Sequence, residues 1–200
     1  MKTNLYLIAV LLVCAYMGGC RNPWMERVLI SLYDIGDRGP GGGIIFYRSA
    51  KGFTDKYSGK THHFLEAAPI DQGSFAWATA GSSAEINVSG AVETAIGTGR
   101  KNTARILNTT YDPFNDTPAA FLCNDYTGGG KSDWFLPSLD ELSQLSSNWT
   151  YVSYLQSGDG YWSSSQSILN ADRAMIQNIN SIQDEIGKSV SFSVRPIRSF

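Results

Sequence analysis

Cysteine and histidine are scarce in this sequence, and their scarcity removes several kinds of chemistry. The chain has 3 cysteines and 2 histidines among 200 residues. Cys14 and Cys20 belong to the apolar N-terminal stretch, so Cys123 is left alone in the remainder, without a partner for a disulfide or a thiolate zinc site. Cys123 ends an apolar segment with helical spacing, so we expect a buried structural thiol. His62 and His63 are adjacent, and neighbours on a strand point to opposite faces, so we predict no metal site and no cofactor.

Clusters of basic residues and long apolar runs are also missing. The formal net charge is −2 and the pair Arg100-Lys101 is too small to form a basic patch, so we predict no nucleic-acid partner. The N-terminal apolar run, residues 5–17, has 13 residues. A helix needs roughly 20 apolar residues to cross a bilayer, so a transmembrane anchor is disfavoured.

The N-terminus has the parts of a bacterial lipoprotein signal. Lys2 precedes the apolar run, and two glycines follow it directly before Cys20. This order predicts a signal peptide at residues 1–19, an acylated Cys20 as the new N-terminus, and a lipidated tether at residues 20–32. An ordinary secretory signal is the alternative, because Met17 stands where leucine is usual in a lipoprotein signal.

Lipidation at Cys20 would make the membrane the first partner of the chain. Two or three acyl chains hold a protein almost irreversibly, whereas one holds it only transiently. We therefore predict a cell-envelope location. Arg21 rather than aspartate follows Cys20, which favours the outer membrane or the cell surface.

Periodicity in residues 33–200 predicts one α+β domain with an antiparallel sheet and about three helices in the middle of the chain. The clearest boundary is a capping box, in which Ser138 precedes a helix and Glu141 follows three residues later. Alternation or apolar runs predict strands, and three- and four-residue spacing predicts helices. The strands are expected at 44–47, 61–66, 161–165, 171–179 and 189–197, and the helices at 102–107, 118–126 and 138–145.

Six short strings occur in a fixed order along this domain, at residues 39–47, 65–69, 96–99, 132–142, 161–165 and 194–198. Together they resemble the family of formerly uncharacterised domains that also form the C-terminal part of Legionella collagen-like adhesins. The resemblance implies a C-type-lectin-like fold and binding rather than catalysis. The chain has no Gly-X-Y repeats, so the collagen stalk is not implied. It also lacks the Glu-Pro-Asn, Gln-Pro-Asp and Trp-Asn-Asp motifs of calcium-dependent sugar sites.

Several residues within these strings are expected to serve the fold. Trp134 and Trp162 are predicted core residues, and Gly43 belongs to a glycine run that suits backbone geometry at a sheet edge. Arg195, like the nearby Arg198, is predicted to pair with a buried carboxylate such as Asp133 or Glu141, because a guanidinium matches a carboxylate in shape. A surface anion site is the alternative.

Aromatic side chains outside these strings are the predicted ligand surface. Trp77, Tyr111, Tyr151 and Tyr154 lie in segments expected to be loops, and aromatic rings stack on sugars and anchor protein interfaces. We therefore predict a non-catalytic, adhesin-like module that binds a glycan or an extracellular or envelope protein.

Two other functions stay open. The first is an envelope scaffold or assembly protein without a small ligand. The second is a hydrolase or modifying enzyme, which would need a concave pocket that joins His62 or His63 to carboxylates. No pair of residues in the sequence identifies catalytic groups, so we predict that the chain is not an enzyme.

Overall fold

The computed structural model describes residues 31–152 and 160–200. The predicted signal peptide, Cys20 and Tyr154 lie outside these residues. The chain divides into the units Met1–Tyr33 and Asp34–Phe200, and the second unit, which holds the elements below, is described by itself.

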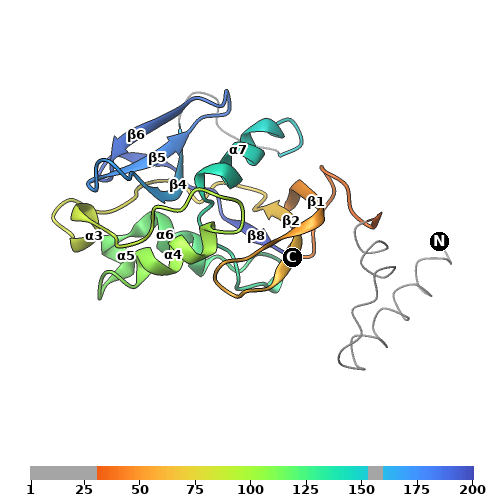
Figure 1. Ribbon diagram of the computed structural model, residues 1–200, viewed down its shortest axis with the longest axis horizontal. Helices are drawn as coiled ribbons and strands as arrows, with labels where there is room; N and C mark the ends of the chain where they lie inside the picture. Colours follow the sequence, from red (N-terminus) through yellow and green to blue (C-terminus); the bar gives the residue numbers. More distant parts are fainter. Residues whose placement is uncertain (1–30, 153–159) are drawn as a thin grey trace. The chain divides into compact units, whose positions relative to one another are not determined.

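A three-stranded antiparallel sheet joins the beginning of this unit to its end. Its order is β1-β2-β8, so the last strand pairs with the second (Figure 1). β1 carries two register shifts, between Ile45 and Tyr47 and between Arg48 and Phe53, which bend the strand. The strands are β1 (Ile44–Thr54), β2 (Thr61–Ala67) and β8 (Ile197–Ser199).

A five-stranded sheet with the order β3-β7-β4-β5-β6 forms the second layer of strands. Its pairs are antiparallel except β4 and β7, which are parallel at Tyr161 and Ser193. The sequence predicted an antiparallel sheet, whereas the structure has one antiparallel sheet and a second sheet that contains a parallel pair. The strand predicted at 189–197 divides between the two sheets, because Pro196 has no N–H to continue a ladder. The strands are β3 (Ser74–Ala76), β4 (Tyr161–Gln166), β5 (Arg173–Gln177), β6 (Gln183–Gly187) and β7 (Ser191–Ser193).

The helices lie in the middle of the chain, between β3 and β4, which confirms the α+β class. Three of them, α4, α6 and α7, correspond to the predicted helices. α3 and α5 are additional four-residue helices, capped by the side chains of Ser82 and Asp112. In Figure 1, α4, α5 and α6 lie together on one side of the five-stranded sheet. The bounds are α3 (Ser83–Ile86), α4 (Gly99–Leu107), α5 (Pro113–Asp116), α6 (Pro118–Asp125), a 3-10 turn η1 (Gly128–Gly130) and α7 (Leu139–Ser147).

Two apolar clusters form the core. One surrounds Trp77 and Trp162 and includes Cys123, whose predicted burial is confirmed and raises the pKa of its thiol. The other joins Phe46 on β1 to Leu142 on α7. Burial of these side chains fixes the helices against both sheets.

Trp77 corrects one of the predicted ligand positions. Its exposed fraction is 0%, and its indole N–H donates to the backbone oxygen of Ser163 at 2.8 Å. The ammonium of Lys188 lies 4.6 Å from the centre of its ring. Trp77 therefore belongs to the core, as do Trp134 and Trp162, for which burial was predicted.

Candidate functional site

The buried carboxylate of Glu66 explains the glycine-rich string before β1. It accepts backbone N–H groups of Gly41 at 3.0 Å and Gly43 at 3.1 Å, and it pairs with Arg198 at 2.8 Å. A Cβ added at Gly43 would lie 2.5 Å from the carbonyl oxygen of Ala67, closer than any side chain tolerates. The glycines therefore let the loop approach β2 and present its N–H groups to the carboxylate.

A second buried carboxylate, Glu141, holds the start of α7. It accepts the backbone N–H groups of Gly97 and Ser138, each at 2.8 Å, while the Ser138 hydroxyl accepts the N–H of Glu141 at 3.4 Å. The predicted capping box is confirmed. Burial raises the pKa of Glu141 to about 7.

The two arginines pair with other carboxylates than Glu141. Arg195 bonds Asp71 and donates to the backbone oxygen of Ala68 at 2.7 Å, while Arg198 bonds Asp133 and Glu66. The prediction of buried ion pairs is confirmed, and Asp133 is confirmed as a partner. Glu141 as a partner was wrong, because the backbone of its own capping box and of residue 97 already occupies its oxygens.

The six ordered strings of the sequence analysis therefore contribute residues to the surroundings of these two carboxylates. The backbone of Ser164 donates to Pro137 at 2.6 Å, and the Ser165 hydroxyl accepts from the N–H of Leu139 at 3.1 Å, so the string in β4 joins the same assembly. These contacts specify the fold.

A cavity of about 230 Å³ opens beside α4. It is smaller than the roughly 300–1,000 Å³ typical of pockets for drug-sized ligands, so it suits one compact chemical group. Its walls come from the turn between β1 and β2, from α4, from the end of α6 and from the segment before α7. The lining residues are Tyr57, Arg100, Thr103, Ala104, Asn124, Ser132, Asp133, Trp134 and Phe135.

One buried acid positions two of these lining residues. Asp55 accepts the backbone N–H of Tyr57 at 2.9 Å and the hydroxyl of Ser58 at 2.6 Å, and it lies 3.5 Å from the guanidinium of Arg100. That guanidinium lies 5.3 Å from the centre of the Tyr57 ring. Tyr57 is 58% exposed, so its ring is available at the mouth of the cavity.

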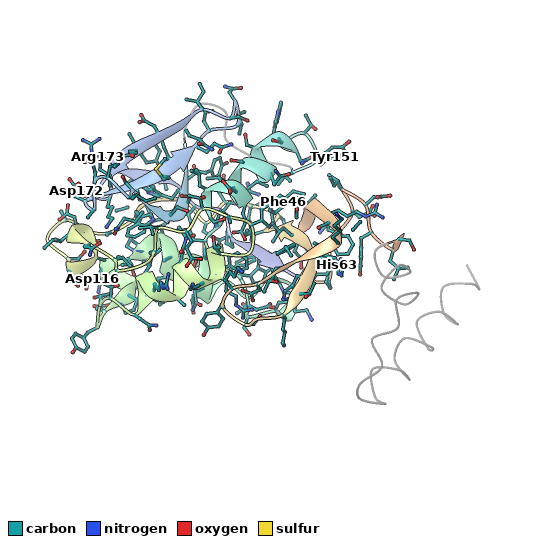
Figure 2. The ribbon with its side chains drawn as sticks, viewed as in Figure 1. Phe46, His63, Asp116, Tyr151, Asp172 and Arg173 are labelled. Carbon is teal, nitrogen blue, oxygen red and sulfur yellow. The ribbon has the colours of Figure 1, made fainter. Side chains whose placement is uncertain are left out.

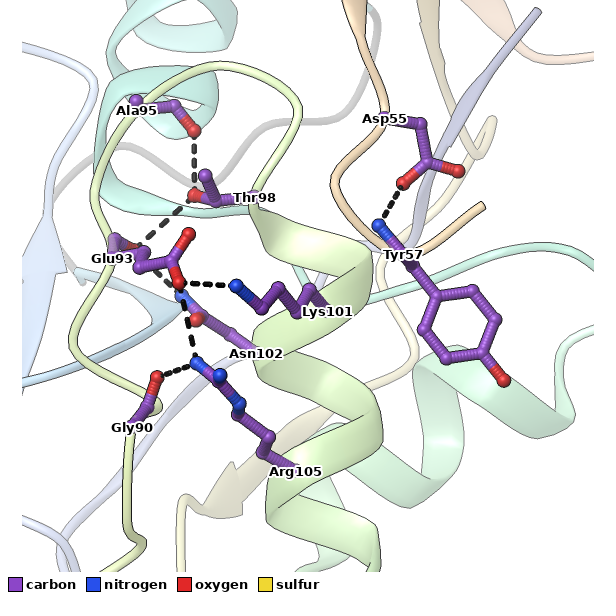
Figure 3. Close-up of polar contacts among 9 residues, drawn as sticks. All are labelled: Asp55, Tyr57, Gly90, Glu93, Ala95, Thr98, Lys101, Asn102 and Arg105. Atoms are coloured by element: carbon purple, nitrogen blue, oxygen red, sulfur yellow. Dashed lines mark hydrogen bonds and ion pairs between the residues drawn. The ribbon is translucent and has the colours of Figure 1, made fainter. Parts of the chain in front are cut away.

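The opposite side of α4 is fixed by a second acid, as Figure 3 shows. Glu93 bonds Lys101 at 2.6 Å and Arg105 at 3.3 Å, while its backbone oxygen accepts the side-chain amide of Asn102 at 2.6 Å. The hydrogen bond from Lys101 lowers the pKa of Glu93. These bonds attach α4 to the preceding loop and so hold Arg100 at the cavity.

Polar groups around the cavity retain hydrogen-bonding capacity. Within residues 31–152 and 160–200, the side chains of Asn124 and Ser132, the Tyr57 hydroxyl and Oδ2 of Asp133 form no hydrogen bond. Thr103 differs, because its hydroxyl already bonds the backbone of α4 and of residue 136. The cavity therefore offers several donors and acceptors around an aromatic ring.

The histidines do not line this cavity. The ring Nδ1 of His63 lies 2.9 Å from the backbone oxygen of Ser49, and Nε2 of His62 is buried without a hydrogen-bond partner. Burial lowers the pKa of His62. The cavity contains the carboxylate of Asp133 but no imidazole. In the described part of the chain, no three acidic, cysteine or histidine side chains come close enough together to hold a metal ion.

Of the predicted aromatic positions that the structure describes, Trp77, Tyr111 and Tyr151 do not line the cavity. Tyr111 and Tyr151 are both exposed. Tyr111 follows Thr110, which bonds Asp116, and Figure 2 shows Asp116 and Tyr151 at opposite ends of the domain. The two tyrosines therefore do not form one surface. No sequence pattern identifies Tyr57 and Asn124 as neighbours, because the cavity forms only when separate segments fold together. An aromatic residue in a Ser-Gly turn was the one local signal for Tyr57.

Comparison with known proteins adds no relative, since neither a family model nor a curated protein matches the chain. Among the described residues, no helix combines the length and apolarity required to traverse a bilayer.

Proposed function

We propose that this domain is a non-catalytic, adhesin-like binding module with a C-type-lectin-like fold, and that it binds a glycan through one sugar unit in the cavity beside α4. The observation that carries the proposal is the set of uncommitted polar groups around the exposed ring of Tyr57. A sugar presents hydroxyl groups that both donate and accept hydrogen bonds, and it presents C–H faces that pack on aromatic rings.

The size and walls of the cavity support a carbohydrate over a large apolar ligand. At about 230 Å³ the cavity has room for a compact ring, and most of its lining side chains are polar. Asn124 provides an amide that can donate and accept, while Asp133 provides an acceptor. Only the buried Trp134 and Phe135 line it with large apolar side chains.

The N-terminal sequence supports display of this module from a membrane. The lipoprotein-like signal before Cys20 would tether the domain by acyl chains in the cell envelope, at the outer membrane or the cell surface. The lectin-like fold is supported by the α+β architecture and by the six strings, whose residues contact one another around Glu66 and Glu141.

A glycan array with the full-length chain in detergent tests the proposal. We expect binding to a restricted set of glycans, weakened about threefold to tenfold by Asn124→Ala, because one hydrogen bond contributes about 0.5–1.5 kcal/mol. Tyr57→Ala should weaken binding by a similar factor through the lost ring contact.

Tyr111→Ala is the matched control, because it removes an exposed tyrosine that does not line the cavity. Its binding should equal that of the unaltered chain. An array without any bound glycan would overturn the proposal. Binding that survives both cavity variants but disappears in Tyr111→Ala would also overturn it, because the ligand would then lie elsewhere.

A further inference from the structure

Two opposite charges line the cavity without pairing with each other. The side chains of Arg100 and Asp133 are 27% and 30% exposed, and neither forms an ion pair with the other. Each instead has its own counter-ion behind the cavity wall. Arg100 lies 3.5 Å from Asp55, which is 2% exposed, and Asp133 bonds Arg198, which is 11% exposed.

From this arrangement we infer that the cavity selects an uncharged sugar and discriminates against acidic sugars and amino sugars. The inference rests on the proposed function and specifies its ligand class. A buried counter-ion already compensates each charge that faces the ligand, so the cavity presents a strong donor and a strong acceptor with little net attraction for a further charge.

The surrounding charges make the selection against acids the stronger one. Besides Asp55 and Asp133, Glu66 lies directly behind Arg198 at 2.8 Å, so three carboxylates face two guanidinium groups in this region. A sugar carboxylate near Arg100 would compete with Asp55 and be repelled by Asp133.

A sugar ammonium faces the converse difficulty. Its natural position is beside Oδ2 of Asp133, but Arg198 already bonds the other oxygen of that carboxylate, and Arg100 lines the same cavity. A sugar hydroxyl carries no charge, so neither the carboxylate of Asp133 nor the guanidinium groups repel it. Neighbouring hydroxyls of one ring can accept from Arg100 and donate to Asp133, and hydrogen bonds to charged groups are stronger than those between neutral groups.

Matched sugars test the inference on the full-length chain. The probes are the methyl glycosides of glucose, glucuronic acid and glucosamine, and the corresponding galactose series, measured by titration with calorimetry or ligand-detected NMR at pH 7 and low salt. We expect the neutral member of the better-bound series to bind at least about tenfold more tightly than its acidic and amino counterparts. Equal or tighter binding of a charged member would overturn the inference and leave the proposed function intact.

Removal of the hidden counter-ion gives a sharper test. Asp55→Asn keeps an acceptor for the N–H of Tyr57 but leaves the charge of Arg100 uncompensated. The ratio of uronate to neutral-sugar affinity should rise about tenfold. Asp184→Asn is the control, since it removes an exposed carboxylate from β6, which does not line the cavity, and the ratio should stay unchanged.

Circular dichroism establishes that each variant is folded. If Asp55→Asn fails to fold, Asp133→Asn provides the same test, because it removes a negative charge from the cavity wall and should raise the same ratio. A folded variant with an unaltered ratio would overturn the inference. Absence of binding to the six glycosides and to every glycan on the array would instead overturn the proposed function and this inference with it.

Discussion

Glu66 and Glu141 are two fully buried carboxylates that bind loop backbone in the same way but differ in how their charge is compensated. Each accepts backbone N–H groups from a glycine-containing loop. Glu66 also has the guanidinium of Arg198, whereas no lysine or arginine of the described chain forms an ion pair with Glu141. The first region therefore depends on a cation, and the second depends on the protonation of its acid.

The two carboxylates support different walls of the cavity. Arg198 links Glu66 to Asp133, which lines one wall. Glu141 receives hydrogen bonds from the backbone of Gly97 and Gly99, directly before Arg100 on the other wall. Residues that encode the fold thereby also set the spacing of the two charges that face the proposed ligand.

Loss of Arg198 should have the largest effect on stability. Arg198→Met leaves the buried Glu66 without its cation, and removal of one partner from a buried ion pair costs about 3–5 kcal/mol. Urea denaturation of the full chain measures this loss. The double variant Glu66→Gln with Arg198→Met should recover a large part of it, because the fully buried charge at position 66 is removed together with its cation and only the partly exposed Asp133 loses a partner. A loss below about 1 kcal/mol in the single variant would contradict the assigned dependence on the cation.

Glu141 should make stability depend on pH, up to about 3 kcal/mol. Its pKa rises from 4.5 to about 7 in the folded chain, so between these values the folded state holds a proton that the unfolded state releases. This contribution is complete below pH 4.5 and is lost as the pH rises through 7. In Glu141→Gln the free energy of unfolding should fall less over this range than in the unaltered chain.

The slope rather than the absolute stability is the relevant measurement, because the glutamine amide also places a donor against backbone N–H groups. Asp184→Asn on β6 is the control, since its side chain is exposed and that variant should follow the unaltered chain. Identical slopes for Glu141→Gln and the unaltered chain would show that ionisation of Glu141 is not the source.

Local sequence signals predicted the elements that local contacts form. Ser138 and Glu141 stand three residues apart, so their capping box was readable without any knowledge of the fold. The apolar run at residues 44–47 likewise predicted a strand, and Pro69 marked the end of the strand predicted at 61–66. β6 was missed because its strand is short and polar, as suits the edge of a sheet.

The burial of Trp77 could not be predicted, because it depends on residues more than eighty positions away. Ser163 accepts its N–H, and Lys188 covers its ring. The Lys188 ammonium is itself buried and donates to Ala84 and Gln166, each at 2.8 Å, and burial lowers its pKa to about 8. Lysine side chains are ordinarily exposed, so no local pattern indicates this arrangement. The cavity could not be predicted either, because its walls come from four segments that are separate in the sequence.

The smallest expected effect is that of Ser138→Ala, which separates the contribution of the serine cap from that of the Glu141 carboxylate. Ser138→Ala removes the hydroxyl that accepts the N–H of Glu141 and donates to the backbone oxygen of Ala95 at 3.0 Å, while the backbone N–H of residue 138 still reaches the carboxylate. Loss of a serine cap costs about 1 kcal/mol, so urea denaturation should show a decrease of that size. Because the carboxylate stays buried, the pH dependence should remain. A variant that loses both stability and pH dependence would mean that the hydroxyl, and not burial, controls the protonation of Glu141.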